Sequence, residues 1–183
     1  MTHIIQPTML FSNRLILRSY QNNDENILFP IYFGDPAASK YLQRCPHKDI
    51  AQTKKALLLW AKQKWEYLDS EFMWIIANRI TQQPMGILIF MQQQDIGEIH
   101  FGLVSVYQNQ GFMQEAITTA LLFFRQTSKL RKIETFSAID NISSRKALEK
   151  SGFNQVQFLP SYAIFPNISS SAQDCMKYHL LFN

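Results

Sequence analysis

The spacing of apolar positions changes several times along this chain, and each change marks a predicted element. Short stretches in which apolar and polar residues alternate predict strands, and longer stretches with apolar residues three or four apart predict helices. The predicted strands are 13–20, 72–78, 86–91, 98–104, 133–139, 155–159 and 176–182, and the predicted helices are 49–68, 112–128 and 144–151. Short helices are also expected to open at Asp24 and at Asp35-Pro36, and 160–173 is expected to be a long loop.

The order of these elements is typical of an α/β domain with a mixed sheet. No linker or internal repeat divides residues 1–183, so we expect a single domain. Hydrophobic residues make up 46% of the chain and include 14 Phe and 3 Trp, which is enough for an aromatic-rich core. Charged residues make up 17%, and this composition argues against disorder.

The charge of the chain favours a small anionic ligand over a nucleic acid. The formal net charge is +4, and the lysines and arginines are scattered without forming a basic stripe. A mildly basic protein attracts phosphorylated ligands, whereas nucleic-acid binding requires a clustered basic surface. We therefore expect no nucleic-acid partner.

The cysteines and the apolar runs indicate in which cellular compartment the protein is expected. Cys45 and Cys175 lie far apart and lack the spacing of metal ligands, so we expect incidental thiols in a reduced compartment and no metal site. The first ten residues lack the pattern of a signal peptide, and the longest apolar runs, such as 56–61 and 87–91, are too short to cross a bilayer. These features predict a cytoplasmic protein without a membrane partner.

The most informative segment is VSVYQNQGFMQEA at 104–116. A predicted strand ends there, a short loop follows, and Gly111 precedes the helix predicted at 112–128. Backbone N–H groups at a helix N-terminus favour negative charge, and a glycine allows a ligand to approach them closely. Residues 108–113 therefore match a nest for a pyrophosphate, but a glycine before a helix more often serves only a turn. Both interpretations stay open on this segment alone.

The same segment resembles motif A of the GNAT acetyltransferases. That motif consists of Gln or Arg, two residues, Gly, one residue, and Gly or Ala, and it places Gln108, Gly111 and Met113 at the key positions. Met113 replaces the usual Gly or Ala, and Asn109 stands where a further Gly is common. These departures leave less room for a ligand but retain the backbone amides.

Further stretches resemble the RimJ/RimL branch of this family. RLILRSYQNND at 14–24 is similar to its R-L-x-L-R-x-x-x-x-x-D opening, and DNISSRKALEKSGF at 140–153 is similar to its D-N-x-x-S-x-x-x-L-E-K-x-G-F stretch. Residues 174–181 fit the last strand of the branch, and Gln114-Glu115-Ala116 fits its T-E-A helix start with one change. The resemblance therefore covers nearly the whole chain in the right order.

The resemblance implies a GNAT-like α/β fold, with a mixed, mostly antiparallel central sheet and helices on both faces. Two splayed parallel strands, 98–104 and 133–139, would hold the co-substrate acetyl-CoA in the V-shaped gap between them. The resemblance assigns the backbone of Leu103 and Val104 to the pantetheine, the amides of Gln110, Gly111, Phe112 and Met113 to the pyrophosphate, and Asn141 and Ser144 to the opposite side of the cofactor. Gln108 and Asn109 belong to the same predicted nest, and a backbone N–H at Leu103 or Val104 could stabilise charge on the thioester oxygen. Helix capping is the alternative role of Asn141 and Ser144, and the two roles are compatible.

The implied reaction, attack of an amine on a thioester, needs a base because alkylammonium groups have a pKa near ~10. We expect Glu98 to be this base, since it lies on the strand leading to the nest and histone acetyltransferases of the superfamily carry their base on the corresponding strand. His100 faces the same side and is the second candidate, and a purely structural role is the alternative for both. Many GNATs place a proton-donating Tyr where this chain has Leu148, so Ser144, water or no group would protonate the thiolate.

The predicted function is transfer of an acetyl group from acetyl-CoA to a primary amine, with a protein N-terminus of the ribosomal-protein type as the first candidate acceptor. Small amines such as polyamines, amino acids or antibiotics are the alternative acceptors. A non-catalytic module that binds acetyl-CoA as a sensor is a different class, slightly favoured by the imperfect motif A. The acceptor pocket is expected from 31–69 and 160–173, in a monomer or homodimer.

Overall fold

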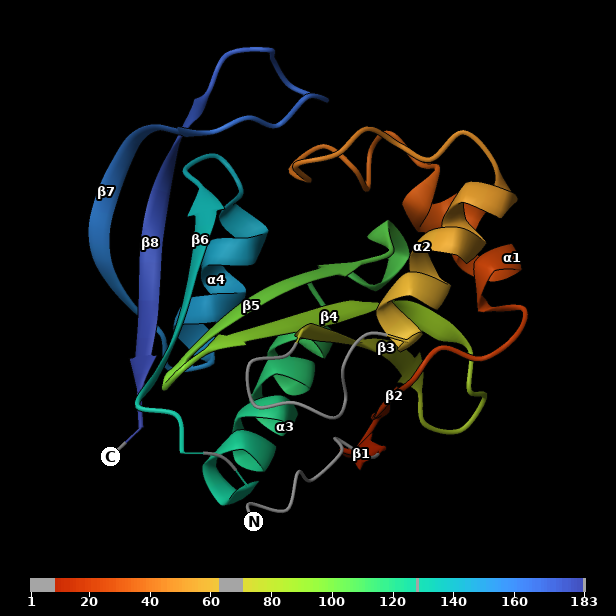
Figure 1. Cartoon of the computed structure of the whole chain (residues 1–183), viewed down its shortest axis with the longest axis horizontal. Helices are drawn as coiled ribbons and strands as arrows, with labels where there is room; N and C mark the ends of the chain where they lie inside the picture. Colours follow the sequence, from red (N-terminus) through yellow and green to blue (C-terminus); the bar gives the residue numbers. More distant parts are fainter. Residues whose placement is uncertain (1–8, 63–70, 128, 183) are drawn as a thin grey trace.

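The computed structural model describes residues 9–62, 71–127 and 129–182. These residues form one mixed sheet of eight strands in the order β1-β2-β3-β4-β5-β6-β8-β7, with helices on both faces (Figure 1), which confirms the predicted fold class. The strands are β1 (Leu10–Phe11), β2 (Leu15–Arg18), β3 (Glu71–Asn78), β4 (Pro84–Gln93), β5 (Ile96–Leu103), β6 (Lys132–Ala138), β7 (Asn154–Ala163) and β8 (Gln173–Leu181). The helices are α1 (Asp24–Leu28), the π-helix η1 (Phe29–Phe33), α2 (Ile50–Lys62), the short 3-10 helix η2 (Ser105–Tyr107), α3 (Phe112–Thr127) and α4 (Ile142–Lys150).

The strands β5 and β6 form the parallel pair of the sheet, and the other strand pairs in the described part of the chain are antiparallel. Pairing between β5 and β6 extends only over 96–98 and 132–134. A hydrogen bond from Thr135 Oγ1 to the carbonyl of Ile99, at 2.7 Å, is one more link between the two strands. Beyond it the strands separate, so their ends splay apart as predicted (Figure 1).

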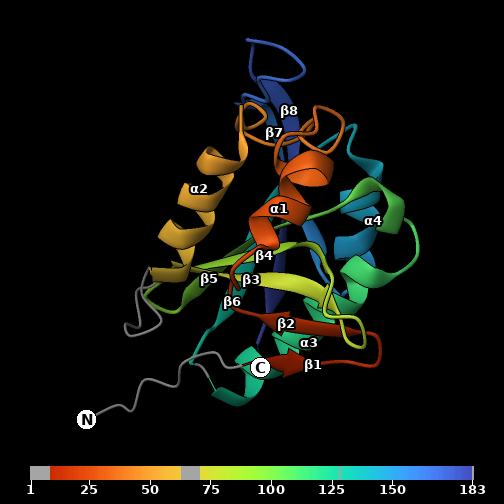
Figure 2. The same cartoon turned by 90° about the vertical axis from the view of Figure 1, so that its right-hand side faces the viewer.

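Two apolar layers pack on opposite faces of the sheet, because alternate residues of each strand point to opposite sides. On one face, α3 and α4 cover a core that contains Trp74 and Phe90, and the ring of Phe124 stacks on Phe90 at 4.1 Å between centroids. On the other face, α1, η1 and α2 cover a second core that includes Ile75 and Leu57. Figure 2 shows these helices on either side of the strands.

The helix α2 begins where the sequence predicts it. Oδ1 of Asp49 accepts a hydrogen bond from the N–H of Gln52 at 2.7 Å and so caps the first turn. The predicted helix 49–68 is confirmed as far as Lys62, and its last part lies outside the described residues. Among the described residues, no helix has both the length and the apolar character needed to cross a membrane.

The helix predicted to open at Asp35 is wrong. Oδ1 of Asp35 accepts a hydrogen bond from the N–H of Ala37 at 3.0 Å, but residues 36–41 form only turns. The reason is tertiary, because Nδ2 of Asn167 donates to the carbonyl of Ser39 at 2.6 Å. This contact holds the segment against the loop between β7 and β8, in a path that a helix would not follow.

The loop between β7 and β8 is shorter than the predicted 160–173. β7 continues through Ala163, and β8 begins at Gln173. Pro160 argues for a loop in the sequence, but β7 is an edge strand, where a proline is tolerated at a bulge. The pairing of β7 with β8 indeed shifts register between Leu159 and Ala163.

Candidate active site

A cavity of about 530 Å³ lies between the end of β5 and the first turns of α4, the helix that follows β6. One wall is the end of β5, from Phe101 to Leu103, and another is formed by residues 141–150 at and in α4. The turn before α3 with the first turn of that helix, the segment 37–42 and Tyr32 complete the lining. Five parts of the chain therefore converge on one concave site, which is the usual form of a small-molecule site.

The turn before α3 has the backbone conformation of an anion nest. Gly111 has a φ of +79° and Asn109 a φ of +60°, so left-handed residues alternate with others. The N–H of Glu115 donates to the carbonyl of Gly111 at 3.0 Å and so starts the helical ladder. The N–H groups of residues 112–114 have no partner within the helix and point out of its N-terminus. A Cβ at Gly111 would lie 3.5 Å from Arg14 Nη2, so the positive φ rather than lack of space requires glycine here.

Three lysines give the cavity a positive charge. Lys40, Lys146 and Lys150 line it, and no Asp or Glu is present among the described lining residues. Arg14 also lies beside the nest, where its Nη1 donates to the carbonyl of Gln110 at 3.1 Å, but its charge is paired with Glu115, whose Oε2 accepts from Arg14 Nε at 2.6 Å. These lysines were not among the predicted site residues, although Lys146 and Lys150 stand four residues apart on a predicted helix and therefore share one side of it.

The end of β5 directs a backbone amide into the gap. The N–H of Val104 donates to the carbonyl of Met85 at 2.9 Å, so this amide is held by β4. Backbone groups alternate in direction along an antiparallel pair, so those of Leu103 point away from β4 toward the gap. Accordingly, the carbonyl of Leu103 accepts a hydrogen bond from Gln108 Nε2 at 2.9 Å. Of the two amides predicted to serve the pantetheine and the thioester, that of Leu103 faces the cavity and that of Val104 does not.

Asn141 and Ser144 lie on the cavity wall at the start of α4. Oδ1 of Asn141 also accepts a hydrogen bond from the N–H of Ser144 at 3.3 Å, so Asn141 is the N-cap of the helix. The capping role is therefore present, and the side chain is still adjacent to the space that a ligand would fill.

Asn141→Ala is expected to lower the free energy of unfolding by about 1 kcal/mol, because the cap is lost. Asn141→Asp keeps the cap and the stability but places a carboxylate beside the cavity, so it should bind coenzyme A more weakly. Urea denaturation measures the change in the free energy of unfolding, and calorimetric titration with coenzyme A measures the change in affinity. If Asn141→Asp binds coenzyme A as tightly as the wild type, Asn141 serves only as a cap.

Two of the predicted cofactor residues turn their side chains away from the cavity. Nε2 of Gln110 donates to the carbonyl of Val106 at 2.6 Å, and the Arg14 guanidinium lies over the Phe112 ring, 4.1 Å from its centroid. Contacts of their backbone amides with a ligand stay a prediction. The predicted cofactor residues that line the cavity are Leu103, Gln108, Asn109, Gly111, Met113, Asn141 and Ser144.

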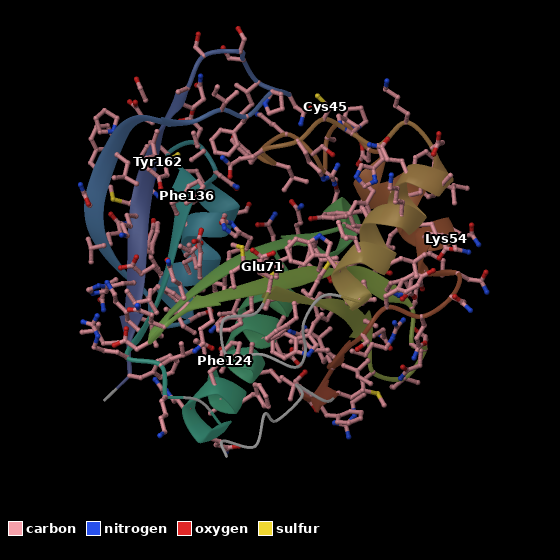
Figure 3. The ribbon with its side chains drawn as sticks, viewed as in Figure 1. Cys45, Lys54, Glu71, Phe124, Phe136 and Tyr162 are labelled. Atoms are coloured by element: carbon pink, nitrogen blue, oxygen red, sulfur yellow. The ribbon has the colours of Figure 1, made fainter. Side chains whose placement is uncertain are left out.

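Glu98 and His100 form a pair on β5. Nε2 of His100 lies 2.7 Å from Oε1 of Glu98, and both side chains are partly exposed. The imidazole packs edge-on against Phe136 on β6, with 5.6 Å between centroids, and Phe136 packs in turn against Tyr162 on β7. Figure 3 shows Phe136 and Tyr162 together on the arm of the V formed by β6, β8 and β7. The sequence placed Glu98 and His100 on one side of a strand, and the structure adds that they contact each other.

Neither Glu98 nor His100 is among the described residues that line the cavity. His100 is two residues from Gly102, which does line it, and this corresponds to about 7 Å along the strand. Glu98 lies about twice as far away, at the point where β5 and β6 are still paired. His100 is therefore the nearer of the two candidate bases, and a water molecule would have to bridge the rest of the distance.

The segment 35–45 covers the cavity. The hydroxyl of Tyr41 donates to the carbonyl of Asp140 at 3.0 Å and so reaches across to the turn before α4. Nδ2 of Asn167 also donates to the carbonyl of Arg44 at 2.8 Å. Figure 3 shows Cys45 on this segment, above the gap and close to the loop between β7 and β8. These contacts bring together the two regions from which the acceptor pocket was predicted.

Comparison with known proteins assigns the chain to a family. Residues 14–154 match the family described as the acetyltransferase (GNAT) domain. The chain belongs to the GNAT acetyltransferases. This acetyltransferase is also 26% identical over 156 residues to "Uncharacterized N-acetyltransferase p20" of Bacillus licheniformis, and the alignment covers 84% of this chain and 86% of the relative.

Solved structures share the fold of this acetyltransferase at low sequence identity. Ribosomal-protein-S5-alanine acetyltransferase from Vibrio fischeri has a TM-score of 0.81 at 15% identity, over 96% of this chain and 97% of that one. Spermidine N-acetyltransferase from Vibrio cholerae, in complex with CoA and spermine, has a TM-score of 0.75 at 16% identity, over 93% and 96% of the two chains. One neighbour is named for a protein and the other for a polyamine, so the fold does not decide the acceptor or the branch of the family.

Proposed function

We propose that this acetyltransferase takes its acetyl group from acetyl-CoA and transfers it to a primary amine, with a protein N-terminus as the favoured acceptor. The observation that carries the proposal is the cavity, in which the nest before α3 and three lysines meet without an opposing carboxylate among the described lining residues. The backbone N–H groups of the nest and the ammonium groups of Lys146 and Lys150 on α4 match the phosphates of coenzyme A, whereas Lys40 lies in the segment that covers the cavity.

Different residues of the chain have different roles in acetyl transfer. Bound acetyl-CoA supplies an acetyl group activated as a thioester. The N–H of Leu103, which faces the gap, stabilises negative charge on the thioester oxygen. His100, held by Glu98 at 2.7 Å, accepts the proton of the attacking ammonium through water. A thiolate is a weak base and leaves without a strong acid, which fits the presence of Leu148 in place of a Tyr.

Lys40 favours an acceptor that carries a single positive charge. It lies in the segment 35–45 that covers the cavity, and a polyamine would meet a like charge there. A protein N-terminus presents one amine at the end of an uncharged backbone. A panel of N-terminal peptides and spermidine, compared by kcat/KM with mass spectrometry of the products, tests this preference. A higher kcat/KM for spermidine than for every peptide would contradict the proposed acceptor but not the proposal that acetyl-CoA is the donor.

Acetyl-CoA is expected to raise the melting temperature. A ligand at ~100 times its Kd stabilises the folded state by about 2.7 kcal/mol. For a domain of this size, that corresponds to a shift of roughly 5–10 °C. Scanning fluorimetry with acetyl-CoA, and with acetate as the control, measures the shift. No shift at saturating acetyl-CoA would contradict the proposed donor.

A further inference from the structure

The hydroxyl of Tyr32 is buried at the cavity without a hydrogen-bond partner among the described residues. Tyr32 is 1% exposed, and it is one of the residues that line the cavity. Buried hydroxyls nearly always find a partner, because desolvation without a hydrogen bond costs free energy. Arg18, Ser39, Arg44 and Trp74 also bury an unpartnered polar atom in the described part of the chain, but none of these four lines the cavity. An unpartnered donor at a cavity wall points to a ligand atom.

The position of this hydroxyl depends on a wide helical turn. Tyr32 lies in the π-helix η1, where the N–H of Gly34 donates to the carbonyl of Phe29, five residues earlier, at 2.7 Å. Segments of π-helix occur frequently at functional sites, since they redirect side chains that an α-helix would align. The Tyr32 ring is fixed by an edge-on contact with Phe33, at 5.1 Å between centroids. The hydroxyl is therefore held in place rather than free to turn away.

The hydroxyl lies directly over the end of β5. A Cβ at Gly102 would come within 2.1 Å of Tyr32 Oη, so only glycine allows the tyrosine to approach the strand here. The next residue, Leu103, directs its N–H into the gap. Two hydrogen-bond donors, one from the backbone and one from a side chain, therefore flank the same strand end.

We propose that the hydroxyl of Tyr32 donates a hydrogen bond to the carbonyl oxygen of the acetyl group, as a second donor beside the N–H of Leu103. The inference rests on the proposed function, since it requires acetyl-CoA in the cavity. When the amine nitrogen bonds to the carbonyl carbon, the C=O electron pair moves onto the oxygen, where both donors stabilise the charge. The pair then returns and the C–S bond breaks. The Glu98–His100 pair already holds the proton that the ammonium lost before the attack, so the second proton of the nitrogen goes through water to the departing thiolate, which leaves as the thiol.

Tyr32 acts as a hydrogen-bond donor and keeps its proton. Burial raises the pKa of Tyr32 to about 12, and the nearby Arg44 guanidinium opposes this shift only in part. A thiol has a pKa near ~8.5, so proton transfer from Tyr32 to the thiolate would be unfavourable. The tyrosine is neutral across the physiological range and offers its O–H throughout the reaction.

Tyr32→Phe removes the hydroxyl and keeps the ring. Bound acetyl-CoA labelled with ¹³C at the carbonyl is expected to show a higher C=O stretching frequency in this variant than in the wild type. The affinity for acetyl-CoA relative to S-ethyl-CoA, which has no carbonyl, should fall about three- to tenfold. Turnover should fall by roughly 10²–10³-fold, as for loss of one oxyanion donor. The affinity for coenzyme A and the melting temperature should not fall, because no internal hydrogen bond is lost.

Tyr20→Phe is the matched control, because its hydroxyl donates to Glu25 Oε2 at 2.8 Å, outside the cavity lining. It should leave the frequency and the affinity ratio unchanged. Should Tyr32→Phe not fold, incorporation of 2,3-difluorotyrosine at position 32 gives a stronger donor and should lower the frequency instead. A wild type that binds no acetyl-CoA would overturn both the proposed donor and this inference. Suppose that the wild type binds acetyl-CoA and transfers the acetyl group, but that Tyr32→Phe changes neither the C=O stretching frequency nor the affinity ratio. That result would overturn this inference alone.

Discussion

Glu98→Gln is expected to lower turnover by roughly 10²–10⁴-fold while the affinity for acetyl-CoA stays nearly unchanged. The substitution keeps the size of the side chain next to His100 but removes the negative charge that stabilises a protonated imidazole, 2.7 Å away. The loss should fade at high pH, since the α-amino group of a protein N-terminus, with a pKa near ~8, then loses its proton without help. Steady-state kinetics over a pH series measure both effects.

His100→Gln and the double variant show which group takes the proton. If the pair acts as a unit, each single variant and the double variant lose turnover to a similar extent. Glu134→Gln is the matched control, because Glu134 stands in register with Glu98 on β6 and pairs with Lys177. Full activity of Glu98→Gln with loss in His100→Gln would assign the base to His100 alone. Full activity in both single variants would mean that positioning of the amine and the hydrogen-bond donors to the thioester oxygen suffice for catalysis.

Gly111→Asp is expected to weaken acetyl-CoA binding by roughly 10²–10³-fold. A carboxylate about 4 Å from a phosphate charge costs about 4 kcal/mol at an effective dielectric constant near 20. Arg14 offsets part of this cost, because its Nη2 would lie 3.5 Å from the new Cβ. Titration calorimetry with acetyl-CoA measures the loss in affinity.

Gly152→Asp is the control that separates the effect of the added charge in Gly111→Asp from the effect of backbone strain. Gly152 has a φ of +92°, similar to the +79° of Gly111, and it follows α4 outside the cavity lining. Both variants strain the backbone in the same way, but only Gly111→Asp places its charge in the nest. Gly152→Asp should therefore bind acetyl-CoA like the wild type. Unchanged affinity in a folded Gly111→Asp would show that the nest does not hold the pyrophosphate.

The order and type of most elements followed from local patterns. Strand alternation predicted the two strands that splay, and the apolar stripe of 112–128 predicted α3, which the structure describes from Phe112 to Thr127. Gly111 before a helix left both a turn and a nest open, and its predicted role was to let a ligand approach. The structure gives a different reason for the glycine, a positive φ, which is a local requirement. The cap at Asp49 could also be predicted from local sequence, because its donor, Gln52, stands only three residues away.

Only the tertiary structure decided how distant groups meet. Asn167 turns the segment around Ser39 away from a helix across 128 residues of sequence, and no local pattern contains that contact. Val104 is excluded as a donor by its bond to Met85, because strand pairing selects which amides face a neighbour. The lysines of the cavity and the hydroxyl of Tyr32 converge on one space from separate elements. Periodicity determines which face of an element is buried, whereas long-range packing determines what that face meets.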